Sequence, residues 1–113
     1  MKFVPKGWGW ELWIENNEKY CGKKLFFLKE KKLSFHYHLL KTETFWLESG
    51  ELLVEYGYDD DITKAEKIIL KPGDRFHVPI GLRHRMTGLL DTVMFEFSTH
   101  HEDSDSYRII KGD

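Results

Sequence analysis

The sequence predicts an all-β protein, built as a sandwich or a small antiparallel barrel, and three observations support this. Short segments rich in aromatic and other strand-favouring residues recur along most of the chain. Turn-forming residues, chiefly glycine, proline, serine and aspartate, separate them. No segment has a convincing helical pattern. About eight short strands at regular spacing are typical of sandwiches and small barrels.

The expected strands follow one another with turn residues between most neighbours. They are 20–28, 32–38, 43–47, 51–56, 67–70, 75–78, 84–87 and 91–98. Glu48-Ser49-Gly50, Lys71-Pro72-Gly73 and Pro79-Ile80-Gly81 supply three of the turns. The connection 57–61 ends in three aspartates but lacks the glycine and terminal glutamate of a calcium loop. We interpret it as a solvated hairpin turn.

The composition limits the class of protein. The chain has 113 residues, of which 41% are hydrophobic and 15% aromatic, and this predicts a single domain over 1–113 with one core. The formal net charge is -2, so we expect no nucleic-acid partner. Cys21 is the only cysteine, which excludes an internal disulfide. The sequence has no long apolar segment, so we expect no secretory signal, no membrane span and a cytoplasmic location.

Two stretches hold the residue types of a metal site. In an extended strand His36 and His38 point to the same side, about 7 Å apart. Glu43 and His84 reach the same ion only if the sheet closes on itself. Three imidazoles and one carboxylate suit divalent Mn, Fe, Co, Ni or Zn, and they leave two octahedral positions open for catalysis. The stretches are His36-Tyr37-His38 with Glu43 and Gly50, and Gly73 with Pro79, Gly81 and His84.

These spacings resemble the two motifs of the cupin family. The pattern HxH-x4-E-x6-G from His36 to Gly50 is similar to the first motif, and Gly73-Asp74-x4-Pro79-x-Gly81-x2-His84 is similar to the second. Gly88 stands where the second motif often has asparagine, and Glu30 where a glycine precedes the first histidines. The resemblance implies a small antiparallel jelly-roll β-barrel that holds one divalent metal inside. The implied ligands are His36, His38, Glu43 and His84.

Further segments resemble the cupin domain of type II mannose-6-phosphate isomerases, which often have glutamine at the position of His36. The resemblance implies a metal-dependent aldose–ketose isomerase that acts on a sugar phosphate. Glu43 and Glu96 are the candidate proton carriers. Arg83, Arg85 and Arg108 are candidates for binding the phosphate, because a guanidinium can pair with it bidentately. The similar segments are Lys6-Gly7-Trp8-Gly9-Trp10-Glu11, 33–38, 80–85, Phe95-Glu96-Phe97 and Asp105-Ser106-Tyr107-Arg108.

Several of these residues also have simpler interpretations. Arg83 and Arg85 could serve as rim charges or in ion pairs, and Glu96 could face outward between Phe95 and Phe97. Trp46 alternates with Glu43, so we expect it outside the cavity. We interpret His77 as structural, His100 and His101 as surface residues of a polar tail after the last strand, and Trp8, Trp10 and Trp13 as aromatic cover for the barrel or for a partner subunit.

Two other functions stay open at this point. Three histidines and a glutamate also support oxygen activation, so a mononuclear iron dioxygenase is one alternative. A non-catalytic sugar-binding or metal-binding cupin is the other. In each case the expected partner is a small molecule. Exposed sheet edges and the aromatic N-terminal segment favour a homodimer.

Overall fold

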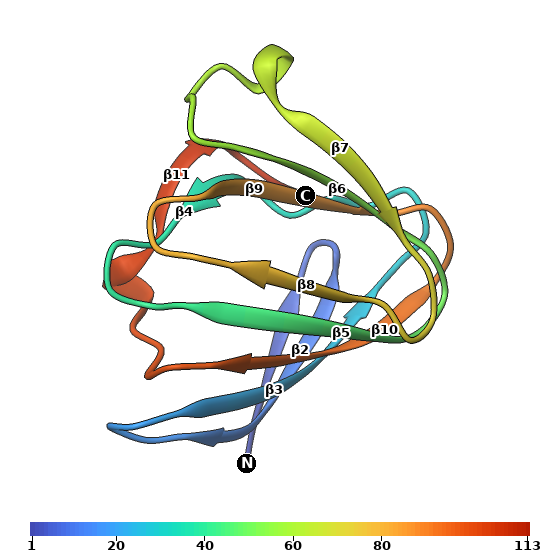
Figure 1. Ribbon diagram of the computed structural model, residues 1–113. Coiled ribbons are helices and arrows are strands. Elements are labelled where there is room, and N and C mark those ends of the chain that lie inside the picture. The colour runs from blue at the N-terminus through green and yellow to red at the C-terminus, as the bar shows by residue number, and fades with distance from the viewer.

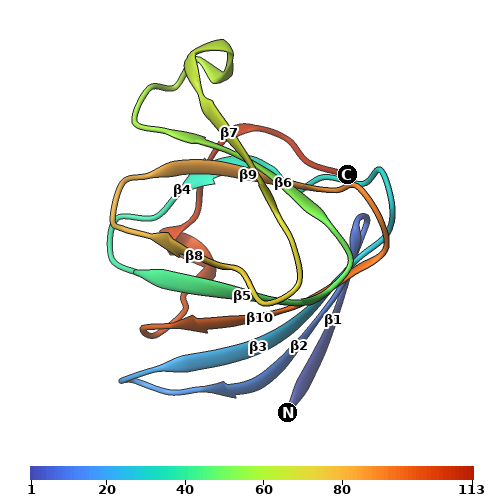
Figure 2. The same ribbon diagram turned by 45° about the vertical axis from the view of Figure 1, so that its right-hand side comes forward.

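The computed structural model describes residues 1–113 and consists almost entirely of antiparallel strands. Two sheets face each other and form a jelly-roll β-barrel (Figures 1 and 2), which confirms the predicted fold class. The six-stranded sheet has the order β1-β2-β3-β10-β5-β8, and the five-stranded sheet has the order β11-β4-β9-β6-β7. The strands are β1 (Lys2–Lys6), β2 (Gly9–Asn16), β3 (Cys21–Phe27), β4 (Phe35–Tyr37), β5 (Glu43–Ser49), β6 (Leu52–Gly57), β7 (Glu66–Leu70), β8 (Arg75–Val78), β9 (Arg83–Gly88), β10 (Thr92–Ser98) and β11 (Tyr107–Ile110).

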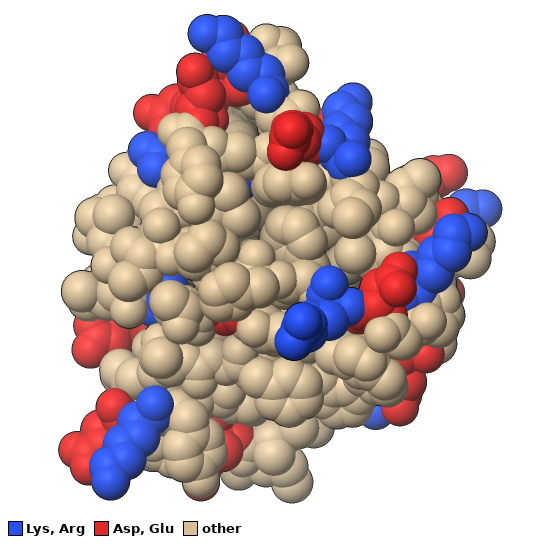
Figure 3. Space-filling model, viewed as in Figure 1, with Lys and Arg blue, Asp and Glu red and all other residues tan.

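The only helices are two single 3-10 turns in connections, η1 (Ile62–Lys64) and η2 (Asp103–Asp105). Neither approaches the length and hydrophobicity that a helix needs to cross a bilayer. The turn η1 lies in the connection between β6 and β7, where Asp61 accepts a hydrogen bond from the backbone N–H of Thr63. Uncharged side chains cover most of the face shown in Figure 3, and acidic and basic side chains gather at its top near η1.

Three strands were missing from the sequence prediction. Pro5 and the lysines at both ends of the strand obscured β1, but proline is tolerated there because β1 is the edge strand of its sheet. The strand β2 follows it as a hairpin partner. The predicted polar tail was wrong: after β10 the chain passes through η2 and returns as β11, which pairs with β4. The expected strand 32–38 shortens to Phe35–Tyr37.

Alternation along the strands places side chains as the two-residue period requires. In β5, Glu43, Phe45 and Leu47 are buried, whereas Trp46 is exposed on the outer face. Gly50 ends this strand at φ 94°, and a Cβ there would collide with the backbone of Asp91. The alternation directs Glu43 into the barrel. The glycine allows the tight turn by which the chain returns as β6.

The hydrophobic core fills the barrel beside the polar residues of the site. It contains twelve buried side chains from both sheets. Trp8 is among them and stacks on Phe27 with ring centroids 4.5 Å apart, so this tryptophan covers the barrel interior. Trp10 instead packs between Phe3 and Phe26 on the outer face of the six-stranded sheet. The core residues are Trp8, Leu25, Phe27, Phe45, Leu47, Leu52, Val54, Leu70, Val78, Leu82, Met86 and Met94.

Candidate metal centre

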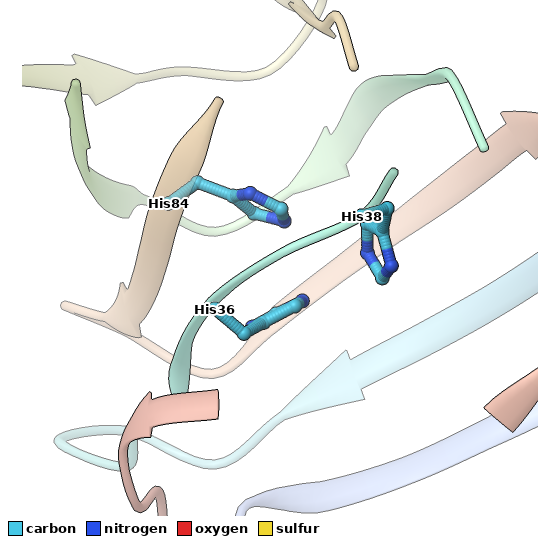
Figure 4. Close-up of side chains that lie close together, drawn as sticks. All are labelled: His36, His38 and His84. Atoms are coloured by element: carbon cyan, nitrogen blue, oxygen red, sulfur yellow. The ribbon is translucent and has the colours of Figure 1, made fainter. Parts of the chain in front are cut away.

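Strand pairing brings three histidines to one point inside the barrel. His36 lies in β4, and His38 is the first residue after that strand. His84 lies in the neighbouring strand β9, where His84 is paired with His36. The ring centroids lie 4.4 Å apart for His36 and His84, 5.0 Å for His36 and His38, and 5.7 Å for His38 and His84. Figure 4 shows the three rings converging. One nitrogen from each ring lies within 4.8 Å of the others, so the three could hold a metal ion.

Backbone carbonyls fix the protonation of these rings. Because a carbonyl can only accept, each Nδ1 carries the ring proton and each Nε2 keeps its lone pair for a ligand. Burial lowers the pKa of His36 well below its ordinary value and also lowers the pKa of His38, so both rings are neutral. The hydrogen bonds run from His36 to Ser34 O (2.9 Å), from His38 to Asp105 O (2.7 Å) and from His84 to Leu82 O (3.0 Å).

Glu43 approaches the histidines from the opposite sheet, at the start of β5. Its Oε2 lies 3.5 Å from Nε2 of His38 and 3.4 Å from Nε2 of His84. Burial would raise the pKa of this carboxyl, but His84 and Lys41 outweigh burial and hold the pKa well below its ordinary value. Glu43 is therefore an anion whose Oε2 is directed at Nε2 of both His38 and His84.

Two buried atoms at this point have no hydrogen-bond partner: Oε2 of Glu43 and Nε2 of His84. Leaving a buried polar atom unpaired costs roughly 1–3 kcal/mol. A cation between the two atoms would remove both penalties at once. The donor set, three imidazole nitrogens and one carboxylate oxygen, is the kind that divalent transition metals prefer. The three histidines therefore fit a metal, and the assignment of Glu43 as the fourth ligand stays a prediction.

Lys41 lies buried beside these donors and was not among the predicted site residues. Its Nζ lies 2.8 Å from Oε1 of Glu43, 3.1 Å from Oε2 of Glu96 and 2.8 Å from Nδ1 of His101. An ammonium has three N–H donors, so these contacts use all of them. Since Lys41 only donates, Nε2 of His101 carries the ring proton and donates it to Asp103 at 2.9 Å. Burial opposes the charge of Lys41, but Glu96 and Glu43 outweigh it and raise its pKa above the ordinary value.

His101 was predicted to lie in a polar surface tail, and this is wrong. The return of the chain as β11 folds the residue onto the barrel, where its side chain is only 11% exposed and contacts the ring of Trp13 edge-on. Burial, together with Lys41 and Lys23, lowers the pKa of His101 to about 4. Its neighbour His100 binds the carbonyl of Asn17 instead, away from the metal centre.

A cavity of about 420 Å³ opens onto the metal centre, within the range of small-molecule sites, roughly 300–1,000 Å³. The four donors, Lys41, Glu96 and His101 all line it. Arg108 lies directly opposite His36 in the pairing of β11 with β4, and its exposed side chain also lines the cavity. Five basic and five acidic side chains line the cavity: Lys6, Lys23, Lys41, Arg108 and Lys111, with Glu11, Glu43, Glu96, Asp103 and Asp113.

Arg83 and Arg85 do not line this cavity. Arg83 extends over the ring of Tyr37 at 3.7 Å and pairs with Asp60 at 2.8 Å. Arg85 is buried, and its guanidinium donates to the backbone carbonyls of Leu33 and Lys111. His77 is exposed and contacts Thr44 on the neighbouring strand. The structure therefore separates these three residues from the four donors.

Sequence reasoning missed Lys23, Lys41 and Glu11 as cavity residues. Lys23 lies on the same side of β3 as Cys21, Leu25 and Phe27, which are buried. A charged residue in such an inward-facing series is an available signal for a polar interior site. No comparable signal existed for Lys41, because it precedes β5 in a loop.

Comparisons with known proteins identify the fold. No protein-family model and no curated protein sequence matches the chain. Among solved structures, the capsular polysaccharide assembling protein CapF from Staphylococcus aureus is similar over 96% of this chain, with 15% identity and a TM-score of 0.83. The chain spans about a third of CapF, 31% of its length.

Two shorter proteins match over most of their own length. The chain covers 92% of KdgF from Halomonas sp., at 17% identity and a TM-score of 0.77, with 92% of this chain aligned. It covers 86% of an RmlC-like cupin from Shewanella frigidimarina, at 17% identity and a TM-score of 0.76, with 91% of this chain aligned. At these identities the likeness shows the fold alone, and that fold is the cupin jelly roll. The relationship to mannose-6-phosphate isomerases stays a prediction.

Proposed function

We propose that this protein is a metal-dependent enzyme that moves a proton between neighbouring carbons of a small hydroxylated carbonyl compound. The substrate class we favour is a sugar phosphate, interconverted between aldose and ketose forms. The observation that carries this proposal is a second buried carboxylate, Glu96, in the same cavity as the four donors. A carboxylate that is not needed as a ligand is what a proton transfer requires.

A divalent ion held by His36, His38, Glu43 and His84 would supply Lewis-acid chemistry that polarises a substrate carbonyl. Glu96 is positioned to carry the proton. Its Oε2 accepts hydrogen bonds from Lys41 and Ser98, whereas its Oε1 makes none. Burial and the nearby Glu43 raise the pKa of Glu96, which increases its affinity for a proton. Oε1 of Glu43 contacts Lys41 and its Oε2 faces the histidines, so we assign Glu43 as a metal ligand.

The charge of the cavity supports an anionic substrate. The basic and acidic side chains that line it are equal in number, so a bound divalent cation would leave the cavity positive. The side chain of Arg108 makes no hydrogen bond or ion pair within the protein, and its guanidinium is free to bind a phosphate bidentately. The structural similarity to CapF, a capsular polysaccharide assembling protein, adds support for a carbohydrate substrate.

The test is exchange of the proton next to the carbonyl, followed by NMR in deuterated water with hexose and pentose phosphates and with the native metal restored. We expect Glu96→Gln to lower kcat by roughly 100-fold or more, because general-base catalysis contributes about that much. Arg108→Met should raise KM more than it lowers kcat.

Arg83→Met is the matched control for Arg108, because its guanidinium lies outside the cavity. It should change neither constant, and Glu96→Gln should retain the metal content of the wild type. Absence of exchange with every sugar phosphate would refute the isomerase assignment. Full activity of Glu96→Gln would refute the role of Glu96.

We also propose that the outer face of the six-stranded sheet pairs two copies of this chain. Aromatic side chains lie on this face in five of the six strands, with Phe3, Trp46 and Phe97 exposed by 60%, 40% and 57%. Six strands spaced about 4.8 Å apart give a face roughly 25 Å wide, enough for the approximately 800 Å² per partner of a standard interface.

Light scattering should therefore give twice the monomer mass, and Phe97→Asp should give the monomer mass because it places a charge within the apolar face. The matched control is Tyr58→Asp, which places the same charge outside this face, in the loop before η1. It should leave the dimer intact. A monomeric wild type at micromolar concentration would contradict this proposal.

A further inference from the structure

The cavity contains a second buried lysine, Lys23. Unlike that of Lys41, its side chain makes no hydrogen bond. Both side chains are only 2% exposed. Lys41 uses all three of its donors on Glu43, Glu96 and His101. The side chain of Lys23 makes no hydrogen bond, and its one ion pair is the 3.7 Å contact between its Nζ and Oε1 of Glu11. Its ammonium therefore lines the cavity without a hydrogen-bond acceptor from the protein.

The neighbours of Lys23 orient its side chain without accepting a hydrogen bond from it. In the pairing of strands Lys23 lies opposite Trp13 of β2 and Glu96 of β10. Its Nζ lies over the ring of Trp13, 4.3 Å from the centroid, a cation–π contact that orients the ammonium. Oε1 of Glu11 is already bound by the indole N–H of Trp13 at 2.8 Å.

The other residues on this side of β3 do not account for a charge at this position. Cys21, Leu25 and Phe27 occupy the same side of β3 and are all buried. An ammonium with one long ion pair recovers little of the hydration that it loses on burial, and an apolar residue would suit this series better. Such a position is explained when a ligand supplies the missing acceptors.

We propose that Lys23 forms a buried anion subsite that binds the carboxylate or phosphate group of a small ligand. The inference rests on the proposed function only in that the ligand shares the cavity with the metal centre. Two strand spacings and two residues along the strand separate Lys23 from Glu43, about 12 Å between their backbones. The ligand class is thus a sugar acid or sugar phosphate that reaches from the metal centre to β3, and Lys23 adds a buried contact to the exposed one at Arg108.

The test uses calorimetry and tryptophan fluorescence, since the ammonium lies against Trp13. The metal-loaded protein and a chelator-treated sample are titrated with inorganic phosphate, with glucuronate and with glucose as the neutral control. We expect one anion to bind both samples and glucose to bind much more weakly. Tighter binding of phosphate identifies a phosphate ester as the ligand class, and tighter binding of glucuronate identifies a sugar acid.

Lys23→Met should weaken the binding of that anion at least ten-fold, whereas Lys24→Met, the adjacent lysine on the outer face, should not change it. The melting temperature of Lys23→Met should be unchanged or higher, and Lys23→Gln provides a second variant should methionine disturb the fold. Unchanged binding in both Lys23 variants, or dependence on Arg108 alone, would overturn the proposal. So would the absence of binding of either anion to the wild type. Loss of isomerase activity with Lys23-dependent binding intact would refute the proposed function and leave the subsite standing.

Discussion

Saturation with a divalent transition metal should raise the melting temperature of this protein by roughly 16–32 °C. A ligand that binds only the folded state stabilises it by about 4 kcal/mol at a thousand times its dissociation constant. For a domain of about 100 residues, 1 kcal/mol corresponds to roughly 4–8 °C. The physical reason is the pair of unpartnered buried atoms, Oε2 of Glu43 and Nε2 of His84, which an ion would satisfy together. Calorimetric melting of chelated and metal-loaded protein measures the difference.

The variants His84→Ala and Glu43→Gln should lose most of this rise, because each removes one of the converging donors. The matched control is His77→Ala. His77 is an exposed histidine on β8 that contacts Thr44, so its removal should leave the full rise. Magnesium, which prefers oxygen ligands, should have a much smaller effect than the transition metals. A rise of equal size in wild type and His84→Ala would show that the metal binds elsewhere.

The barrel was predictable because buried and exposed residues alternate along its strands and turn-forming residues separate the strands. Glu43 and Trp46 illustrate this: three positions apart on β5, one is buried in the site and the other is exposed. The four donors were predictable for a related reason. Each occupies an inward position, and the resemblance to the cupin motifs linked the two halves of the site.

The remaining contacts depend on which strands become neighbours, and local sequence does not encode that. Arg85 illustrates this: its guanidinium binds carbonyls of Leu33 and Lys111, residues that adjoin only after β4, β9 and β11 have paired. His101 reaches the cavity only because β11 returns to β4. A short strand such as β4, with three residues, carries too little pattern to predict its partners.

Replacement of Lys41 by methionine should lower the free energy of unfolding by about 3–5 kcal/mol, the usual effect of removing one partner from a buried ion pair. Lys41 lies between Glu43 and Glu96, and without its ammonium two buried carboxylates would face each other. The charge that raises the pKa of Lys41 is the charge that would then be uncompensated. Urea unfolding of the chelated protein measures the loss, which corresponds to roughly 12 °C or more in melting temperature.

The double variant Lys41→Met with Glu96→Gln should recover part of this stability, because it removes one of the two opposed carboxylates. A bound divalent metal should also reduce the defect, since it neutralises Glu43 from the other side. Lys24→Met, a substitution on the outer face of β3, controls for the loss of a lysine in general and should cost little. If Lys41→Met unfolds at the same urea concentration as the wild type, the network of Lys41, Glu43, Glu96 and His101 does not hold the barrel together. The carboxylates would then be free to share a proton, and Glu96 would no longer be distinguished from Glu43 as the proton carrier.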